Sequence, residues 1–202
     1  MQRHTSNHGV LLEPACGVLK NLSGSSNKVI CSIADGGGFK ALIPAMMNSQ
    51  TNECVQTEGC GALLNLSVLH ENEELIIEAG GISAVMVALK THPQSIKLAS
   101  NACGTLKNLA ATSDENRNRI ATEGGIGSIV SVMGEHIYVA QVQERACGAL
   151  KNLSILVDLK HSMIEARCIQ CLRNAQARHQ SNKDVQRYAA AALANLLKST
   201  GS

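Results

Sequence analysis

The sequence predicts an all-α fold of stacked helical repeats, because two landmarks recur along it at one common step. The first is a segment close to Ala-Cys-Gly followed by Leu-x-Asn-Leu, whose five copies, the last one degenerate, contain Asn21, Asn65, Asn108, Asn152 and Asn195. The steps between these asparagines are 44, 43, 44 and 43 residues. The second is a Gly-Gly pair, replaced by Arg-Cys in the fourth copy, directly before Phe39, Ile82, Ile126 and Ile169. A shared period of this size is typical of a helical solenoid.

Residues 69–111 illustrate how one repeat is divided. Gly80-Gly81 and Pro93 interrupt the helix-forming residues at two places. Between these breaks the apolar residues keep helical spacing. This pattern predicts three helices per repeat, over 71–79, 82–90 and about 94–111.

On a helical wheel the third helix of this repeat has a polar and an apolar face. Asn108 lies at the centre of the polar face, with Asn101 and Gly104 close to it. Cys103 falls at the margin of the apolar face, where a neighbouring repeat could cover it. The predicted core residues of this helix are Ile96, Leu98, Ala99, Ala102, Leu106, Leu109 and Ala110.

Composition favours a folded protein without nucleic-acid or membrane partners. The chain has 202 residues, of which 45% are hydrophobic and 17% charged, as in ordinary globular domains. A net charge of +2 gives no strong attraction to nucleic acid or anionic lipid, and no apolar run approaches the roughly 18 residues of a membrane-spanning helix. Only 1% of the residues are aromatic, so base stacking has little support.

The eight cysteines are interpreted as free thiols. Four of them recur at one position of the repeat, where a small buried side chain fits: Cys16, Cys60, Cys103 and Cys147. Free buried thiols are typical of a reducing compartment, so we expect a cytoplasmic or nuclear protein. Cys168 and Cys171 could suggest a metal or redox site, but they align with glycine and small residues of the other repeats. We therefore expect no metal and no cofactor.

The repeated motif resembles that of the armadillo-repeat family over about residues 14–198. The resemblance implies a right-handed α-α superhelix whose third helices line a concave groove. Partners of such proteins often lie extended in the groove, with the third-helix asparagines bonded to the partner's backbone. Importin-type members have tryptophan four residues before this asparagine. Here that position reads Gly17, Gly61, Gly104, Gly148 and Ala191, which is more similar to the vacuolar and protist members.

The predicted organisation is a short N-terminal segment followed by one repeat domain. Residues 1–13 are expected to be a polar tail or a remnant of expression. The domain, residues 14–198, has about four repeats and about eleven helices, with a partial first repeat over 14–24 and further repeats over about 25–68, 69–111, 112–155 and 156–198. Three apolar residues near the start have no preceding repeat to cover them: Val10, Leu11 and Leu12. We therefore expect self-association through this end.

We expect a non-enzymatic module that binds an extended protein segment, because no catalytic arrangement is present. By the resemblance, the five asparagines would bond to the partner's backbone. Lys107 and Lys151 would favour acidic partners, and a varying column would select side chains: Glu58, Asn101, Arg145 and Tyr188. Two alternatives stay open. Each asparagine could instead bond within its own or a neighbouring helix, and the protein could be a structural scaffold that assembles through its ends or convex face.

Overall fold

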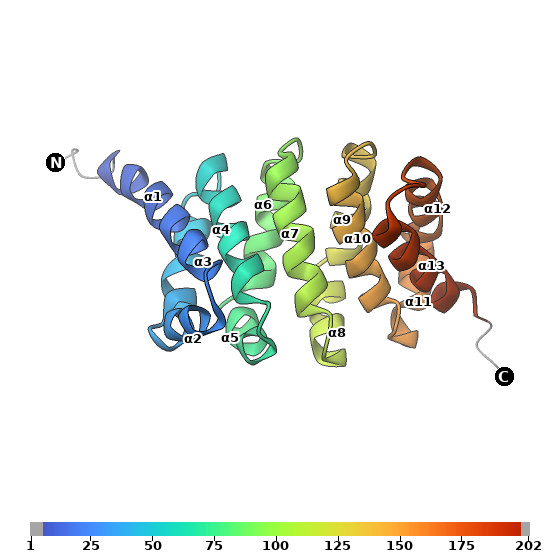
Figure 1. Cartoon of the computed structure of the whole chain (residues 1–202), viewed down its shortest axis with the longest axis horizontal. Coiled ribbons are helices and arrows are strands. Elements are labelled where there is room, and N and C mark those ends of the chain that lie inside the picture. The colour runs from blue at the N-terminus through green and yellow to red at the C-terminus, as the bar shows by residue number, and fades with distance from the viewer. Residues whose placement is uncertain (1–5, 199–202) are drawn as a thin grey trace. The chain divides into compact units, whose positions relative to one another are not determined.

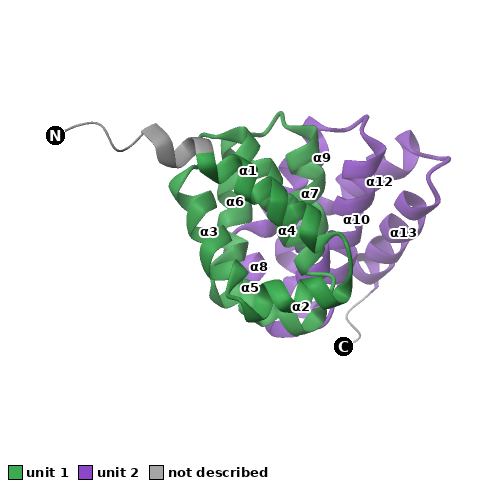
Figure 2. Ribbon diagram, turned by 60° about the vertical axis from the view of Figure 1, so that its left-hand side comes forward, with its two compact units in different colours: residues 1–105 green, residues 106–202 purple. Residues whose placement is uncertain are grey.

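The computed structural model describes residues 6–198, which form thirteen α-helices, two short 3₁₀ helices and no strand. The all-α armadillo solenoid fold is confirmed. The expected count of about eleven helices is wrong, because one N-terminal helix is followed by four complete sets of three. The chain divides into two compact units, residues 1–105 and 106–202 (Figure 2), and the boundary passes through α7 (Ile96–Leu109).

Unit 1 begins with a long helix where the sequence suggested a tail. Helix α1 starts at Ser6, so residues 6–13 are helical and the predicted tail is wrong there; residues 1–5 lie outside the described part. Helix α1 packs against α4, and α3 packs against both α4 and α6 (Figure 1). The helices of unit 1 before α7 are α1 (Ser6–Ser23), α2 (Asn27–Asp35), α3 (Gly38–Asn48), α4 (Glu53–Leu66), η1 (His70–Asn72), α5 (Glu73–Glu78) and α6 (Gly81–Thr91).

Unit 2 repeats this arrangement with two sets of three helices. Helix α10 packs against α9 and α13, and α12 packs against α13 (Figure 1). The helices after α7 are α8 (Asp114–Thr122), α9 (Gly125–Glu135), α10 (Ala140–Leu153), η2 (Val157–Leu159), α11 (Lys160–Glu165), α12 (Cys168–Arg178) and α13 (Lys183–Leu197).

Within residues 6–198, no individual helix combines the length and the apolar content that crossing a membrane requires. Only α2 and α3 taken together meet these criteria, and their axes differ by 76°.

The Gly-Gly landmark marks the turn between the first and second helices. Gly80 has a φ of 87°, a left-handed conformation that glycine adopts without strain. A Cβ atom on the next residue, Gly81, would lie 2.4 Å from Cγ2 of Ile76, so a side chain at Gly81 would clash in this repeat. In the fourth repeat Arg167 takes the left-handed position with a φ of 64°. It is the one non-glycine residue with positive φ among those described, and this costs roughly 1–2 kcal/mol.

The third helices supply much of the core. Leu98, Leu106 and Leu109 are almost fully buried in α7, as the wheel predicts, but Ile96 at the start of α7 is 50% exposed. The recurring cysteine is buried as predicted, with 0% exposure for Cys60, Cys103 and Cys147.

A glutamine nine residues before the repeated asparagine closes the end of the second helix. Gln143 Nε2 donates to the carbonyl oxygens of Met133 (2.9 Å) and His136 (3.1 Å). Gln56 and Gln186 make the same pair of bonds in their repeats. Carbonyl groups at a helix end have no partner within the helix, so this side chain satisfies two of them inside the protein.

We predict that Gln143→Ala lowers the free energy of unfolding by about 1–3 kcal/mol, because two buried carbonyl oxygens lose their donor. Gln141→Ala, an exposed position on the same helix, is the matched control and should change stability by less than about 0.5 kcal/mol. Urea unfolding followed by circular dichroism measures both. Equal midpoints for the two variants would contradict this role of Gln143.

Candidate functional site: the third-helix face

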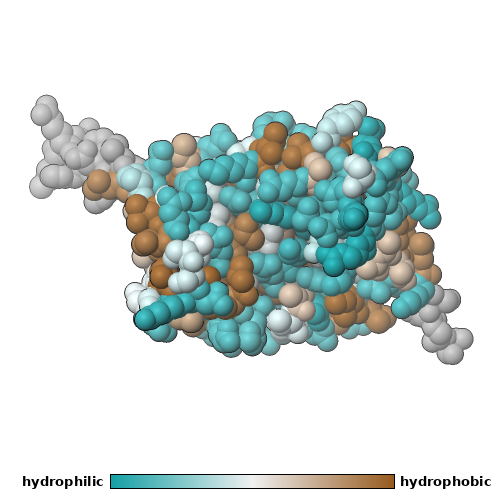
Figure 3. Space-filling view, viewed as in Figure 1, coloured by the Kyte–Doolittle hydropathy of each residue, from teal (hydrophilic) through white to brown (hydrophobic). Residues whose placement is uncertain are grey.

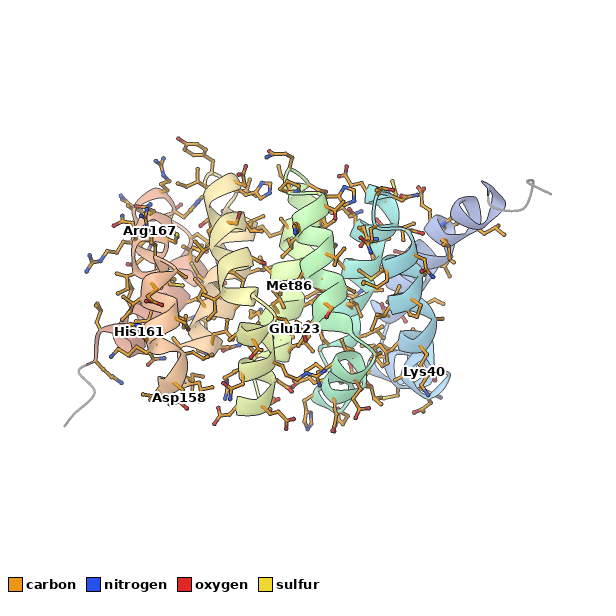
Figure 4. The ribbon with its side chains drawn as sticks, turned by 180° about the vertical axis from the view of Figure 1, so that it is seen from behind. Lys40, Met86, Glu123, Asp158, His161 and Arg167 are labelled. Carbon is orange, nitrogen blue, oxygen red and sulfur yellow. The ribbon has the colours of Figure 1, made fainter. Side chains whose placement is uncertain are left out.

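Within each unit the third helices form a surface, which we call the third-helix face of that unit. It comprises α1, α4 and residues 96–105 in unit 1, and residues 106–109, α10 and α13 in unit 2. Figure 1 labels these helices. Figure 4 labels residues of first helices, second helices and their connections: Lys40, Met86, Glu123, Asp158, His161 and Arg167.

The repeated asparagines bond to the preceding third helix. Asn65 Nδ2 donates to the carbonyl oxygen of Lys20 (2.9 Å), and Asn152 Nδ2 donates to that of Lys107 (2.7 Å). Asn195 Nδ2 donates to Ser154 Oγ (3.1 Å). The structure therefore shows the contact between neighbouring helices that sequence analysis left open as an alternative for these residues.

The asparagines differ in what they leave available to a partner. Asn152 is only 7% exposed, and its Oδ1 accepts a hydrogen bond from Lys151 Nζ (2.9 Å), so its amide is engaged on both sides. Sequence analysis placed such residues at the centre of an open polar face, which is wrong for Asn152. Asn65 Oδ1 has no hydrogen-bond partner among residues 6–198, and Asn21, the first of the series, is exposed. Asn108 and Asn195 are half-buried.

A lysine of the preceding third helix lies against the glycine four residues before the asparagine. A Cβ on Gly61 would lie 2.8 Å from Cδ of Lys20, and a Cβ on Gly148 would lie 2.6 Å from Cδ of Lys107. In each case a side chain of the following third helix flanks the same glycine: Asn101 at Gly61 and Tyr188 at Gly148. We call these two places the Gly61 floor and the Gly148 floor.

At the Gly61 floor the charges are paired. The Glu58 carboxylate bonds to Lys20 Nζ through Oε2 and to Lys97 Nζ through Oε1 (2.6 Å). The Glu58 side chain is 17% exposed. Burial raises the pKa of Glu58, but hydrogen bonds and charges from Lys20 and Lys97 outweigh it, and the pKa of this carboxyl is lowered. Glu58 is therefore an ionised side chain that neighbouring lysines already neutralise.

At the Gly148 floor an aromatic ring takes part instead. Lys107 Nζ lies 5.9 Å from the centroid of the Tyr188 ring, and the Arg187 guanidinium carbon lies 4.6 Å from it. Arg187 also pairs with Asp184 (2.6 Å). Of the predicted selective column, Arg145 occupies in α10 the sequence position that Glu58 has in α4. The two floors therefore differ in charge.

Cys168 and Cys171, the pair that could suggest a metal site, belong to no cluster of metal ligands among the described residues. Cys168 is buried, and burial together with Cys171 raises its pKa to about 12. His179 Nε2 lies 2.9 Å from the carbonyl oxygen of Ile137, and His161 lies beside Glu165. Among the residues that the structure describes, no group of three or more His, Cys, Asp or Glu side chains could hold a metal ion.

Sequence analysis missed a column of histidines after the second helices. His92 Nε2 lies 2.7 Å from the carbonyl oxygen of Gln50, as His179 lies near Ile137. His136 has the equivalent position and is 5% exposed. The steps of 44 and 43 residues from His92 to His136 to His179 carry the signal that could have identified this column. Its contacts join successive repeats, so its role is structural.

Comparison with known proteins agrees with this architecture. Residues 70–111 match the armadillo/β-catenin-like repeat family. This match covers one repeat, and the three-helix repeats together with the solved structures described below show the armadillo fold.

The chain is similar to protein aardvark of Dictyostelium discoideum, with 35% identity over 86 residues, and to vacuolar protein 8 of Candida albicans, with 32% identity over 99 residues. The predicted resemblance to protist and vacuolar members of the family is confirmed. These alignments cover 41% and 49% of this chain but only 11% and 16% of the relatives. The chain thus spans a small part of their length.

Designed proteins share the fold over nearly the whole chain. A designed armadillo repeat protein in complex with the peptide (KR)4 has a TM-score of 0.78 and 22% identity, covering 96% of this chain and 77% of that one. A computationally designed armadillo repeat protein for modular peptide recognition has a TM-score of 0.80 and 22% identity, covering 91% and 75%. At this identity the similarity establishes the fold.

We predict that Asn65→Ala and Asn152→Ala each lower the free energy of unfolding by about 0.5–1.5 kcal/mol without any ligand, because each removes a hydrogen bond between third helices. Asn21→Ala is the control, since Asn21 is exposed and its side chain bonds to no third helix among residues 6–198. Thermal and urea unfolding measure the three variants. If all three were as stable as the wild type, the asparagines would not link the helices.

We predict three rates of thiol alkylation in the native protein. Cys31 is exposed and should react fastest, whereas the hydrogen bond and charge of Glu13 raise the pKa of the exposed Cys54 and should slow it. Cys60 should react only after unfolding, because burial raises its pKa to about 12. Mass spectrometry of the labelled peptides measures the rates. Glu13→Gln should bring Cys54 close to Cys31, and rapid labelling of native Cys60 would contradict the packing.

Proposed function

We propose that the third-helix face binds an extended segment of another protein and catalyses no reaction. The observation that carries this proposal is the pair of glycine floors. At Gly61 and Gly148 the three atoms nearest to an added Cβ all belong to side chains, and the closest is a methylene carbon of a flexible lysine, Lys20 or Lys107. A peptide backbone can approach a helix closely at such a position. The designed armadillo repeat protein in complex with (KR)4 supports this use of the fold.

The polar side chains around the floors fit the two tasks of such a site. Asn21 and the Oδ1 atom of Asn65 are available to bond a partner's backbone, while the side chains beside each floor select its side chains. Packed helices lie roughly 8–10 Å apart and an extended chain advances about 3.3–3.6 Å per residue, so one repeat spans about three partner residues. We also propose an acidic partner, supported by Lys107.

Peptide selection tests this proposal. Twelve-residue peptides enriched from a random library by the wild-type chain would be titrated against Gly61→Leu/Gly148→Leu, which fills both floors. The matched control is Gly127→Leu/Gly134→Leu, since nothing lies within 4 Å of a Cβ at either control position. We expect about a tenfold or greater loss of affinity for the first variant only. Failure to enrich any peptide, or equal affinity for both folded variants, would contradict the proposal.

A second candidate function, assembly through the N-terminal end, is supported by α1. Leu11, Val18 and Leu22 are 68%, 57% and 49% exposed, and hydrophobic surface gathers along α1 in Figure 3. Val55, Ala62 and Leu66 hold the equivalent positions of α4 and are 0% exposed. Leu12 is half-buried, and the side chain of Val10 lies outside the described residues.

We expect self-association that Val18→Glu abolishes, because a charge would interrupt this apolar stripe. Val68→Glu, at another exposed valine, is the control and should associate like the wild type. Light scattering over a range of concentrations measures this. A wild-type chain that stays monomeric throughout would rule out the scaffold candidate at this end.

We propose a cytoplasmic or nuclear location, and the support is the set of buried thiols. Cys60, Cys103, Cys147 and Cys168 are fully buried, as expected of cysteines that persist in a reducing compartment. Fluorescence microscopy of the tagged protein tests it, and secretion into the medium would contradict it.

A further inference from the structure

At the two floors an equivalent lysine has a neighbouring sequence position of opposite charge. Lys20 and Lys107 both precede the repeated asparagine, and each lies across the glycine of the following third helix. The position three residues before that glycine is Glu58 in α4 and Arg145 in α10. The chain therefore offers an internal comparison, with a carboxylate opposite the lysine in unit 1 and a cation at that position in unit 2.

In unit 1 the carboxylate shows which ligand group the floor accepts. Glu58 Oε2 bonds to Lys20 Nζ while the stem of Lys20 rests over Gly61, and Oε1 bonds to Lys97. The Glu58 side chain is 83% shielded from solvent by this surrounding, since 17% of it is exposed. A carboxylate thus fits beside the lysine without any displacement of the backbone.

In unit 2 the equivalent lysine, Lys107, lacks a carboxylate partner. No carboxylate within residues 6–198 forms an ion pair with Lys107, whose ammonium instead lies near the Tyr188 ring. Arg145 takes on α10 the position that Glu58 has on α4, and the Arg187 guanidinium carbon lies 4.6 Å from the centroid of the same Tyr188 ring. A lysine ammonium without a carboxylate partner favours an anion that can reach it.

The other charged groups on these helices leave the balance positive. Asp184 pairs with Arg187, and Lys151 bonds to the amide oxygen of Asn152. Glu144 is half-buried beside Arg145 in sequence. The charged side chains on the third-helix face of unit 2 are five cations and two carboxylates: Lys107, Arg145, Lys151, Lys183, Arg187, Glu144 and Asp184.

We propose that an acidic side chain of the bound segment takes, opposite Lys107 at the Gly148 floor, the place that Glu58 takes opposite Lys20 at the Gly61 floor. This inference rests on the proposed peptide-binding function and adds its specificity. Unit 1 contains its own carboxylate and is closed to an acidic residue at this place. Unit 2 has no such carboxylate and can accept an acidic residue, so the acidic residue of the bound segment lies over α10.

The test uses fluorescently labelled octaglutamate, with octaglutamine as the neutral probe, in anisotropy titrations against the full chain. Arg145→Glu installs in unit 2 the carboxylate that unit 1 has, and should lower octaglutamate affinity about tenfold or more. Arg173→Glu makes the same charge change at an exposed position of α12 and should lower it only slightly. Arg145→Gln should fall between them. Circular dichroism checks that each variant is folded.

A variant in unit 1 should change octaglutamate affinity in the opposite direction. Glu58→Gln removes the internal carboxylate and frees Lys20 and Lys97, so octaglutamate affinity should rise several-fold while octaglutamine binding stays unchanged. Equal effects of Arg145→Glu and Arg173→Glu, or no gain from Glu58→Gln, would overturn the inference. If the library peptides bind but octaglutamate binds no better than octaglutamine, the acidic specificity fails and the peptide-binding proposal stands. If no peptide binds, both fail.

Discussion

The structure depends on one lateral contact between neighbouring third helices, seen between α1 and α4 in unit 1 and between α7 and α10 in unit 2. At Asn65 and Asn152 the side-chain amide donates to a backbone carbonyl of the preceding helix. Four residues earlier, a glycine lets a lysine stem from that preceding helix lie against the backbone. A neutral hydrogen bond of this type contributes about 1 kcal/mol. Within each unit this contact, together with the glutamine and histidine bonds at the second helices, holds neighbouring repeats together.

The same contact determines what the third-helix face can bind. An asparagine whose NH₂ group is held by the neighbouring helix has a fixed orientation, so its oxygen is presented without further loss of side-chain entropy. A lysine that crosses a glycine floor brings its charge to a defined place on the next helix. In unit 1 Glu58 forms an ion pair with Lys20. In unit 2 the equivalent position is Arg145, so Lys107 has no carboxylate there. Stacking and recognition therefore use the same residues.

The sequence predicted the fold well because its evidence was periodic. The steps of 43 and 44 residues, the Gly-Gly turns and the apolar spacing are each local signals, and the helix ranges of residues 69–111 agree with the structure to within a few residues. The site was harder to predict. A helical wheel describes one isolated helix, so it placed Asn152 on an open face, whereas the neighbouring helix and Lys151 cover it. The pairing of Lys20 with Glu58, 38 residues apart, has no signature in a single sequence.

The central claim, that lysines of one third helix lie across glycines of the next, can be tested directly by nuclear magnetic resonance. The account predicts strong nuclear Overhauser effects from the Hα protons of Gly148 to the Cγ and Cδ methylene protons of Lys107, and likewise from Gly61 to Lys20. Saturation with a selected peptide should weaken these effects as the lysine stems move aside. If they are absent in the free protein, with both lysines sampling solvent-exposed rotamers, the floors are not built as described and the account is contradicted.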